Sequence, residues 1–406
     1  MKLILYVWGS NSDPVLKRNL INLGYDVVVY DSKCEHYTKD ILFAQGLINI
    51  VHEVDADGVI SFDYFPIISM VCNTVGIVYY SWVYDSPHYT LYAKTSMYKC
   101  NRIGCFDRAM VERLNDLGIN TVFHLPLGVD WGRNAEAGTE NLTDMTSDQC
   151  YTDNKYRCDV SFVGSLYTGE YNYYDSLCKD SVLRGQADNI INRQCFEYRV
   201  DHICNFFDEV CGNGTREDII NRVRVLIDKE NLFPGSEYIE DIEYIFDSFF
   251  LEKKATVEER RRLLNRVADL KCDFRLYTAS DLKSMPRLKN ACRGVVDYHK
   301  KMPFVFRNSR INLNITLRSI KSGIPLRALD IMGCGGFLLS NYQEELAEYF
   351  EEGKEVVMYY ELEDCIEKIN YYLAHEDERK KIAYAGYKAV CERFNIGHQL
   401  SLLLRK

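Results

Sequence analysis

The segment from Ile311 to Asn341 constrains the fold more than any other part of the sequence. Apolar residues recur from Ile311 to Ile315, and a glycine-proline turn at Gly323 then opens a short helical pattern, Leu326 to Cys334. A second apolar run, Phe337 to Leu339, follows two glycines. This order predicts a strand, a loop, a helix and a strand, which is the repeating unit of an α/β protein.

Arg327 stands where this loop meets its helix. Free backbone amides at a helix N-terminus, together with a guanidinium, form a site for a diphosphate. Asp330, one turn further along, would accept hydrogen bonds from sugar hydroxyls. The junction is therefore a candidate for one side of a nucleotide-binding crevice. A surface ion pair between Arg327 and Asp330 across one helical turn explains the same residues without a ligand.

Length and composition narrow the class of protein. A chain of 406 residues exceeds one ordinary core, which predicts two or three domains. The net charge of -10 disfavours a nucleic-acid-binding surface, although a few local cations suffice for a small anionic ligand. The 15 cysteines are scattered and form no C-x-x-C pair. Because the first apolar run, Leu3 to Trp8, is too short for a signal peptide and no run approaches the roughly 18 residues of a membrane span, we expect free thiols in a cytoplasmic protein.

The first part of the chain alternates strand and helix patterns. Strands are predicted near residues 2–8, 26–30, 58–62, 77–83, 102–106 and 121–125, with helices between them. This alternation predicts a parallel sheet covered on both faces, a Rossmann-like domain over residues 1–130. Residues 131–157 are polar and lack either period, so they are predicted to be a linker.

A second α/β domain is predicted over residues 158–390. A helical insertion at about residues 175–270 interrupts it, and Thr256 with Glu259 has the spacing of a capping box that would start a helix there. Further strands are predicted at residues 274–277, around Phe304, and at residues 311–315, 337–339 and 356–359. The apolar tail, residues 391–406, is predicted to form a helix that returns to the first domain.

Several polar residues lie where α/β sheets bind ligands, after the C-terminal ends of strands. Asp85 and His88 follow one strand, where either would serve as a general base or stabilise positive charge. Turn capping explains Asp85 equally well, and a surface position explains His88. Asn314 interrupts an apolar strand, as a binding residue or as a satisfied core amide. Asp55-Ala56-Asp57 has the form of a metal-binding pair, but the helical pattern before it predicts a helix-to-strand turn instead.

The segment from Arg310 to Phe394 carries a Pro-x-Arg sequence, an acid three residues later and the string CGGFLLSN. Together with WVYDSP at residues 82–87, PLGVD at 126–130 and FVGS at 162–165, this segment resembles the CgeB-type, spore-maturation-like bacterial glycosyltransferases of the GT-B superfamily. The resemblance implies two Rossmann-like domains that face a cleft. It also implies a hexosyltransferase-like, metal-independent transfer of a sugar from a nucleotide-diphosphate donor to an acceptor hydroxyl, with no cofactor.

The resemblance also implies roles for Arg327 and Asp330, and positions at strand ends and turns supply the other candidates. The donor would contact the second domain, with Arg327 on the diphosphate and Asp330 on the ribose. Asp85, His88 and Arg327 would be catalytic. The remaining donor-side residues would be Gly164, Ser165, Asn314 and Gly323, and the acceptor-side residues Gly9, Ser10, Asn11 and Asp85. Related retaining enzymes carry two glutamates eight positions apart, whereas this chain has Ser322 and Asp330, which leaves the stereochemistry open.

Two other functions fit the same pattern. A GT-B protein that hydrolyses or epimerises a nucleotide sugar would turn over without an acceptor. A non-catalytic partner subunit would keep the fold and bind nucleotides weakly or not at all. The helical insertion is a candidate surface for a homodimer or for gripping a protein or polymer acceptor, and a glycan, a protein and a small molecule all remain candidate acceptors.

Overall fold

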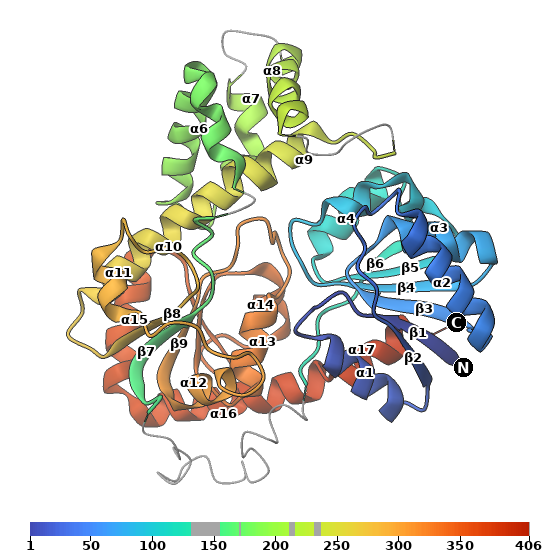
Figure 1. Ribbon diagram of the computed structural model, residues 1–406. Coiled ribbons are helices and arrows are strands. Elements are labelled where there is room, and N and C mark those ends of the chain that lie inside the picture. Colours follow the sequence, from blue (N-terminus) through green and yellow to red (C-terminus); the bar gives the residue numbers. More distant parts are fainter. Residues whose placement is uncertain (131–154, 170–171, 211–215, 231–236, 406) are drawn as a thin grey trace.

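The computed structural model describes residues 1–130, 155–169, 172–210, 216–230 and 237–405 (Figure 1). Most of the predicted linker, residues 131–154, lies outside these residues. Two separate parallel sheets organise the described chain. The fold is thus α/β with two domains, as predicted.

The first sheet has six parallel strands in the order β2-β1-β3-β4-β5-β6. The strands are β1 (Lys2–Tyr6), β2 (Asp26–Tyr30), β3 (Gly58–Phe62), β4 (Val78–Val83), β5 (Asn101–Cys105) and β6 (Val122–His124). Leu3 of β1 pairs with Val27 of β2 on one side and with Gly58 of β3 on the other. The strand order therefore reverses at β1, which creates a crevice between the ends of β1 and β3.

Helices cover both faces of this sheet because side chains alternate along each strand. Ile4 and Tyr6 pack with α2 (Ile41–Val54) and α3 (Pro66–Val75), whereas Leu3 and Leu5 pack with α1 (Asp13–Asn22). The helix α4 (Arg108–Asp116) follows β5, and the 3₁₀ turns η1 (Tyr89–Tyr92) and η2 (Lys94–Met97) follow β4. The core of this domain thus lies in two layers, one on each side of the sheet.

The second sheet has five parallel strands in the order β11-β10-β9-β7-β8. The strands are β7 (Cys158–Val163), β8 (Phe274–Tyr277), β9 (Ser309–Asn314), β10 (Leu338–Asn341) and β11 (Val357–Tyr359). Read from β8, the order matches that of the first sheet, so a second crevice lies between the ends of β7 and β9. The surrounding helices are α11 (Pro286–Ala291), α12 (Met302–Asn308), α13 (Leu326–Gly333), α14 (Glu344–Tyr349), α15 (Leu362–Ala374) and α16 (Glu376–Arg393).

One predicted strand of this domain is wrong. The region around Phe304 forms the helix α12, with Pro303 in its first turn. Proline suits the first turn of a helix because its missing N–H has no intrahelical partner there. The apolar run at this place reads as either element, and the proline is the signal that separates them.

The helical insertion stands above the second sheet and extends toward the first domain (Figure 1). It contains η5 (Tyr173–Lys179), α6 (Ser181–Gln194), η6 (Ile203–Asn205), α7 (Phe206–Val210), α8 (Arg216–Lys229), α9 (Ile242–Phe246), the π-helical stretch η8 (Asp247–Glu252) and α10 (Lys253–Ala268). The segment before α9 joins the first domain, since Ile239 N–H donates to the Tyr92 carbonyl over 2.7 Å and Arg113 pairs with Asp241 at 2.8 Å.

The predicted helix start at Thr256 is also wrong. The chain is helical without a break from α9 to α10, and the Thr256 hydroxyl donates to the Glu252 carbonyl within that helix. The other half of the expected capping box, Glu259, is buried and forms an ion pair with Arg318 at 2.6 Å. A tertiary contact therefore accounts for the glutamate that the sequence pattern assigned to a cap.

The last helix, α17 (Ile396–Leu403), lies against the first domain, next to α1 and β5 (Figure 1). Leu400 and Leu403 are buried there, and the Arg102 side chain donates to the Leu403 carbonyl over 2.6 Å. Among the described residues, no helix is both long and apolar enough to cross a membrane.

Candidate functional site

The loops that follow the strands of the two sheets meet across a domain boundary. The Ser86 hydroxyl, after β4, donates to the Ser319 carbonyl, after β9, over 2.7 Å. His299 Nε2 lies 2.7 Å from the Asn11 carbonyl oxygen, which links the loop after β1 to the second domain. Because ligands of α/β sheets bind at these strand ends, the candidate site lies at the domain boundary.

Asp63 is a buried acid of the first-domain wall that the sequence analysis did not identify. It follows β3 directly, is buried, and has a left-handed backbone with φ of 57°. Its carboxylate accepts the backbone N–H groups of Tyr84 and Asp85 at 3.2 and 3.4 Å. The signal that singled out Asp85, an acid just past a strand, also applied to Asp63.

His88 belongs to the same wall but faces inward. Its Nε2 accepts the Tyr64 N–H over 3.2 Å, and its Nδ1 lies 3.8 Å from the Asp63 carboxylate. Burial lowers the pKa of His88 to about 4, so the ring is neutral near pH 7. These contacts suit a residue that holds the backbone of Tyr64 better than one that receives a proton from a substrate.

Asp85 is exposed at this wall and has the properties of a general base. Desolvation by the surrounding protein, followed by repulsion from Asp63, raises its pKa to about 7. Burial raises the pKa of Asp63 itself to about 7. A carboxylate that titrates near neutral pH and still reaches water is well matched to accept a proton from a hydroxyl.

The predicted acceptor-side turn, Gly9 to Asn11, is held by hydrogen bonds. Gly9 has φ of 97°, a conformation that favours glycine, and its N–H donates to Asp13 over 3.2 Å. The Ser10 hydroxyl lies 2.9 Å from that of Tyr84, beside Asp85. Burial raises the pKa of Asp13 to about 6. The structure thus brings Gly9, Ser10 and Asn11 to the same edge as Asp85.

On the second-domain wall, Arg327 and Asp330 lie together at α13. Arg327 Nη1 is 3.5 Å from the Asp330 carboxylate, and its guanidinium lies 5.4 Å from the centre of the Phe306 ring. Tyr298 donates to the other oxygen of Asp330 over 3.2 Å. Asp330 also lines a small cavity of about 30 Å³ that Ser12 and other first-domain residues close from the opposite side. The pair therefore exists, and its acid faces the domain boundary.

Arg260 is a second cation that the sequence reasoning missed. Its guanidinium donates to the carbonyls of Ser165 and Ile315, at the crevice between β7 and β9, and lies 4.8 Å from the centre of the Tyr167 ring. Burial lowers its pKa, and Arg327 acts in the same direction. Arg260 thus lies at this crevice, near enough to Arg327 for the two positive charges to repel each other. Arg260 sits in the charged run EERRR, which reads as a solvated helix face, so the sequence held no signal for it.

Two predicted donor-side residues have other roles in this structure. Asn314 is buried, and its amide donates to the hydroxyls of Thr316 and Ser340 at 3.0 and 2.9 Å, which makes it a satisfied core amide. At Gly323, a Cβ atom would lie 2.8 Å from the Phe106 carbonyl oxygen. This glycine is needed because the two domains approach closely there. Gly164 and Ser165 remain at the end of β7, beside Arg260.

The aspartates at residues 55 and 57 lie in a helix-to-strand turn, as predicted. Asp55 ends α2 with φ of 51°, and Asp57 accepts the Lys2 N–H over 2.6 Å. Among the described residues, no group of three or more histidine, cysteine, aspartate or glutamate side chains is arranged to hold a metal ion.

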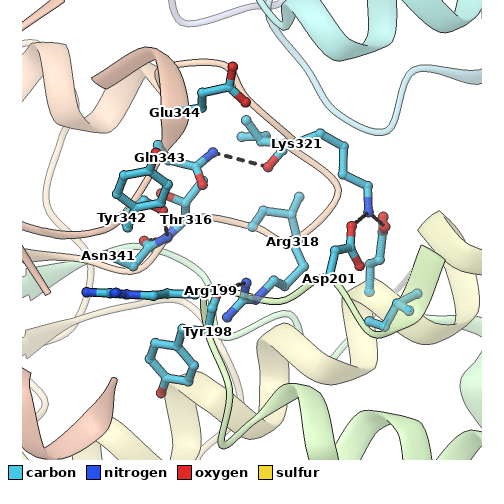
Figure 2. Close-up of a pocket in the computed structure, with 14 residues that line it drawn as sticks. Tyr198, Arg199, Asp201, Thr316, Arg318, Lys321, Asn341, Tyr342, Gln343 and Glu344 are labelled. Carbon is cyan, nitrogen blue, oxygen red and sulfur yellow. Dashed lines mark hydrogen bonds and ion pairs between the residues drawn. The ribbon is translucent and has the colours of Figure 1, made fainter. Parts of the chain in front are cut away.

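A larger pocket, of about 260 Å³, opens beside the loops after β9 and β10 (Figure 2). Residues 316–321 and 341–344 form one part of its wall, and residues 198–203 of the insertion form another. The sequence did not reveal it, because its walls come from segments more than a hundred residues apart.

Comparison with known proteins places the fold. Residues 259–405 match the family model described as glycosyl transferase-like, and this span contains Arg327 and Asp330. A search of curated proteins found no match. The domains and their pairing are those of the GT-B fold.

Two solved structures illustrate the likeness over the whole chain. A glycosyltransferase from Rickettsia africae superposes with a TM-score of 0.51 at 12% identity, covering 99% of this chain and 96% of the other. Sucrose-phosphate synthase from Thermosynechococcus elongatus superposes with a TM-score of 0.54 at 8% identity, covering 99% and 98%. At such identities the likeness concerns the fold.

Proposed function

We propose that this protein is a metal-independent glycosyltransferase that moves a sugar from a nucleotide-diphosphate donor to an acceptor hydroxyl. The observation that carries the proposal is the placement of Arg327 and Asp330. Both belong to the glycosyl transferase-like span, and Asp330 borders a cavity shared by the two domains. The CgeB-type bacterial family and a cytoplasmic location belong to the same proposal, and the free thiols at the described cysteines fit that location.

The residues divide the chemistry between the two walls. On the first domain, Asp85 accepts the proton of the acceptor hydroxyl as its oxygen attacks the anomeric carbon. The bond from that carbon to the diphosphate breaks, and the leaving oxygen gains negative charge. Arg327 and the amides at the start of α13 stabilise that charge, with Arg260 as a nearby buried cation. Asp330 holds the ribose.

Calorimetric titration tests the donor site directly. We expect one of UDP, GDP, TDP or their sugars to bind in the presence of EDTA, and Arg327→Ala to weaken that binding by about 1.5 to 3 kcal/mol, as for a charged hydrogen bond. Arg287→Ala is the matched control, because Arg287 is exposed and pairs with Asp269 away from the cleft.

Other outcomes would overturn the proposal in different ways. If no nucleotide binds the wild-type protein, a non-catalytic partner subunit becomes the better interpretation. If a nucleotide sugar is consumed at the same rate with and without acceptors, the protein is a hydrolase or an epimerase. Loss of turnover in EDTA, restored by a divalent cation, would refute metal independence.

A further inference from the structure

The pocket of about 260 Å³ is separate from the cavity beside Asp330. No residue lines both, and Arg327 lines neither. Its walls are the loops after β9 and β10 and the segment Tyr198 to Ile203, which belongs to the helical insertion (Figure 2). The pocket therefore exists only because the insertion covers the edge of the second sheet.

The charges around this pocket balance. Three cations, Arg199, Arg318 and Lys321, line it. Three carboxylates also line it, those of Asp201, Glu252 and Glu344. Lys321 pairs with Asp201 at 2.6 Å, as a dashed line in Figure 2 shows, and also with Glu252. A site with no net charge favours a neutral ligand over a phosphate or a metal ion.

One wall carries two glutamates, the buried Glu252 and the exposed Glu344. The Glu252 carboxylate is buried, pairs with Lys321 and is also close to the Ser248 hydroxyl, which acts on it as a hydrogen-bond donor. It ends the π-helical stretch η8, and such stretches are frequent at functional sites. The Glu344 carboxylate accepts a hydrogen bond from Arg108 at 3.4 Å and, being exposed, has further acceptor positions for hydroxyl groups of a ligand.

Another wall is aromatic. The Tyr342 side chain is 38% exposed and stacks on Tyr360 with 5.5 Å between ring centres. The Arg199 guanidinium lies 4.1 Å from the centre of the Tyr360 ring, which fixes this side of the pocket. A pyranose ring has an apolar face of C–H groups and a rim of hydroxyls, so an aromatic ring next to carboxylates matches its two surfaces.

The pocket also lies next to the proposed reaction centre. Ser319, in the middle of the loop that forms one wall, accepts a hydrogen bond from Ser86, the neighbour of Asp85. Glu344, on the rim, pairs with Arg108 of the first domain at 3.4 Å. A chain of sugars whose terminal hydroxyl reaches Asp85 would have an adjoining unit at this place.

We propose that this pocket binds one neutral hexose unit of a glycan acceptor. The inference rests on the proposed function, since it assigns the acceptor of that transferase. It gives the helical insertion a role, which is to hold the acceptor through residues 198–203. It also makes the acceptor a carbohydrate with at least one residue beyond the one that reacts.

Saturation-transfer NMR on the full chain tests this site without any nucleotide. The probes are the methyl glycosides of glucose, galactose, mannose and N-acetylglucosamine, with glucose 6-phosphate as the charged comparison. We expect at least one methyl glycoside to bind. Tyr342→Ala should weaken its affinity about tenfold, because an aromatic contact is lost. Glucose 6-phosphate should bind more weakly than the methyl glycoside of glucose. Tyr371→Ala is the control, because Tyr371 is similarly exposed but packs on His375.

A second arm separates this inference from the proposed function. Saturating UDP, GDP or TDP should leave glycoside binding unchanged, as should Arg327→Ala. Displacement of the glycoside by a nucleotide would show that the sugar binds at the donor site. That result would overturn the inference but would leave the proposed transferase function standing. Absence of glycoside binding, or equal binding by Tyr342→Ala, would also overturn it. If the protein binds a glycoside but no nucleotide, the proposed transferase function is refuted, and the pocket is then not an acceptor site.

Discussion

The hydroxyl oxygen of Ser322 lies 3.0 Å from the Asp107 carboxylate, on the opposite side of the domain boundary. The same hydroxyl is 2.8 Å from Glu345. One hydroxyl proton cannot serve two ionised carboxylates, so a proton on Asp107 would complete this group. Burial, with a contribution from Glu345, raises the pKa of Asp107 in the direction that this requires.

Ser322→Ala should therefore destabilise the protein. The substitution leaves Asp107 and Glu345 buried with one partner fewer, which costs about 1 to 3 kcal/mol. Urea unfolding measures the change. Ser401→Ala removes an exposed hydroxyl that bonds only its own helix, and it should change the free energy of unfolding by less than about 0.5 kcal/mol. Equal effects of the two substitutions would show that the contact across the boundary adds no stability.

Gly323→Ala should weaken the domain contact itself. The new methyl group would lie 2.8 Å from the Phe106 carbonyl oxygen and 2.9 Å from the Asp107 Cα, and backbone atoms cannot move aside easily. We expect a loss of about 1 to 3 kcal/mol on unfolding, as for an overpacked core.

Gly185→Ala is the opposite case and the control for Gly323→Ala. Gly185 lies inside α6, and a Cβ there would meet nothing within 4 Å. Alanine should stabilise this helix by about 0.5 to 1 kcal/mol. Thermal unfolding of both variants should show melting temperatures that shift in opposite directions. A shift of the same sign in both would refute the steric explanation.

The sequence predicted the two α/β domains because its apolar periods repeat strongly. The runs at residues 2–6 and 309–314 are largely buried strands, and Gly9 follows the first of them within three residues. Its errors, at Phe304 and Thr256, lie where a local pattern admits two elements. There, tertiary contacts such as that of Glu259 with Arg318 decide the outcome, and a single sequence does not contain them.

The candidate site was predictable only where a residue follows a strand or opens a helix. Asp85, Arg327 and Asp330 have such positions, and the structure brings Asp330 to a cavity shared by the two domains, with Arg327 next to it. Arg260 reaches its crevice from the middle of a charged helix, so neither spacing nor composition identifies it. The role of Ser322 depends on Asp107, which is 215 positions away.

If Asp85 is the base, the pH dependence of transfer follows from its pKa. The carboxylate must be ionised to accept a proton, so kcat/KM should rise with pH through about 7 and then level. Asp85→Asn should remove this limb and lower the rate by about 10²- to 10⁴-fold. Asp175→Asn, at a side chain that is 95% exposed on the insertion, should keep the wild-type profile. A wild-type profile in Asp85→Asn would assign the proton to another group.

The raised pKa of Asp63 leads to a separate prediction, which concerns how stability depends on pH. Its pKa rises from 3.8 to about 7 on folding, so between these values the folded state holds a proton that the unfolded state has released. Stability contributed by this group is therefore lost as pH rises through that range. Asp63→Asn removes the titration, keeps an oxygen that accepts the Tyr84 N–H, and tolerates the left-handed backbone.

Melting temperatures measured from pH 4 to 8 should show this difference. The wild-type protein should lose stability relative to Asp63→Asn as pH rises, and the gap should be largest at pH 8. His88, whose pKa is lowered to about 4, has the opposite sign and is present in both proteins. Asp63→Asn also removes the charge that raises the pKa of Asp85, and this change widens the gap in the same direction. Asp55→Asn, at an exposed residue with φ of 51°, controls for the backbone conformation and should run parallel to wild type. Parallel curves for wild type and Asp63→Asn would mean that Asp63 is ionised throughout, and that its hydrogen bonds with the backbone of Tyr84 and Asp85 offset its burial.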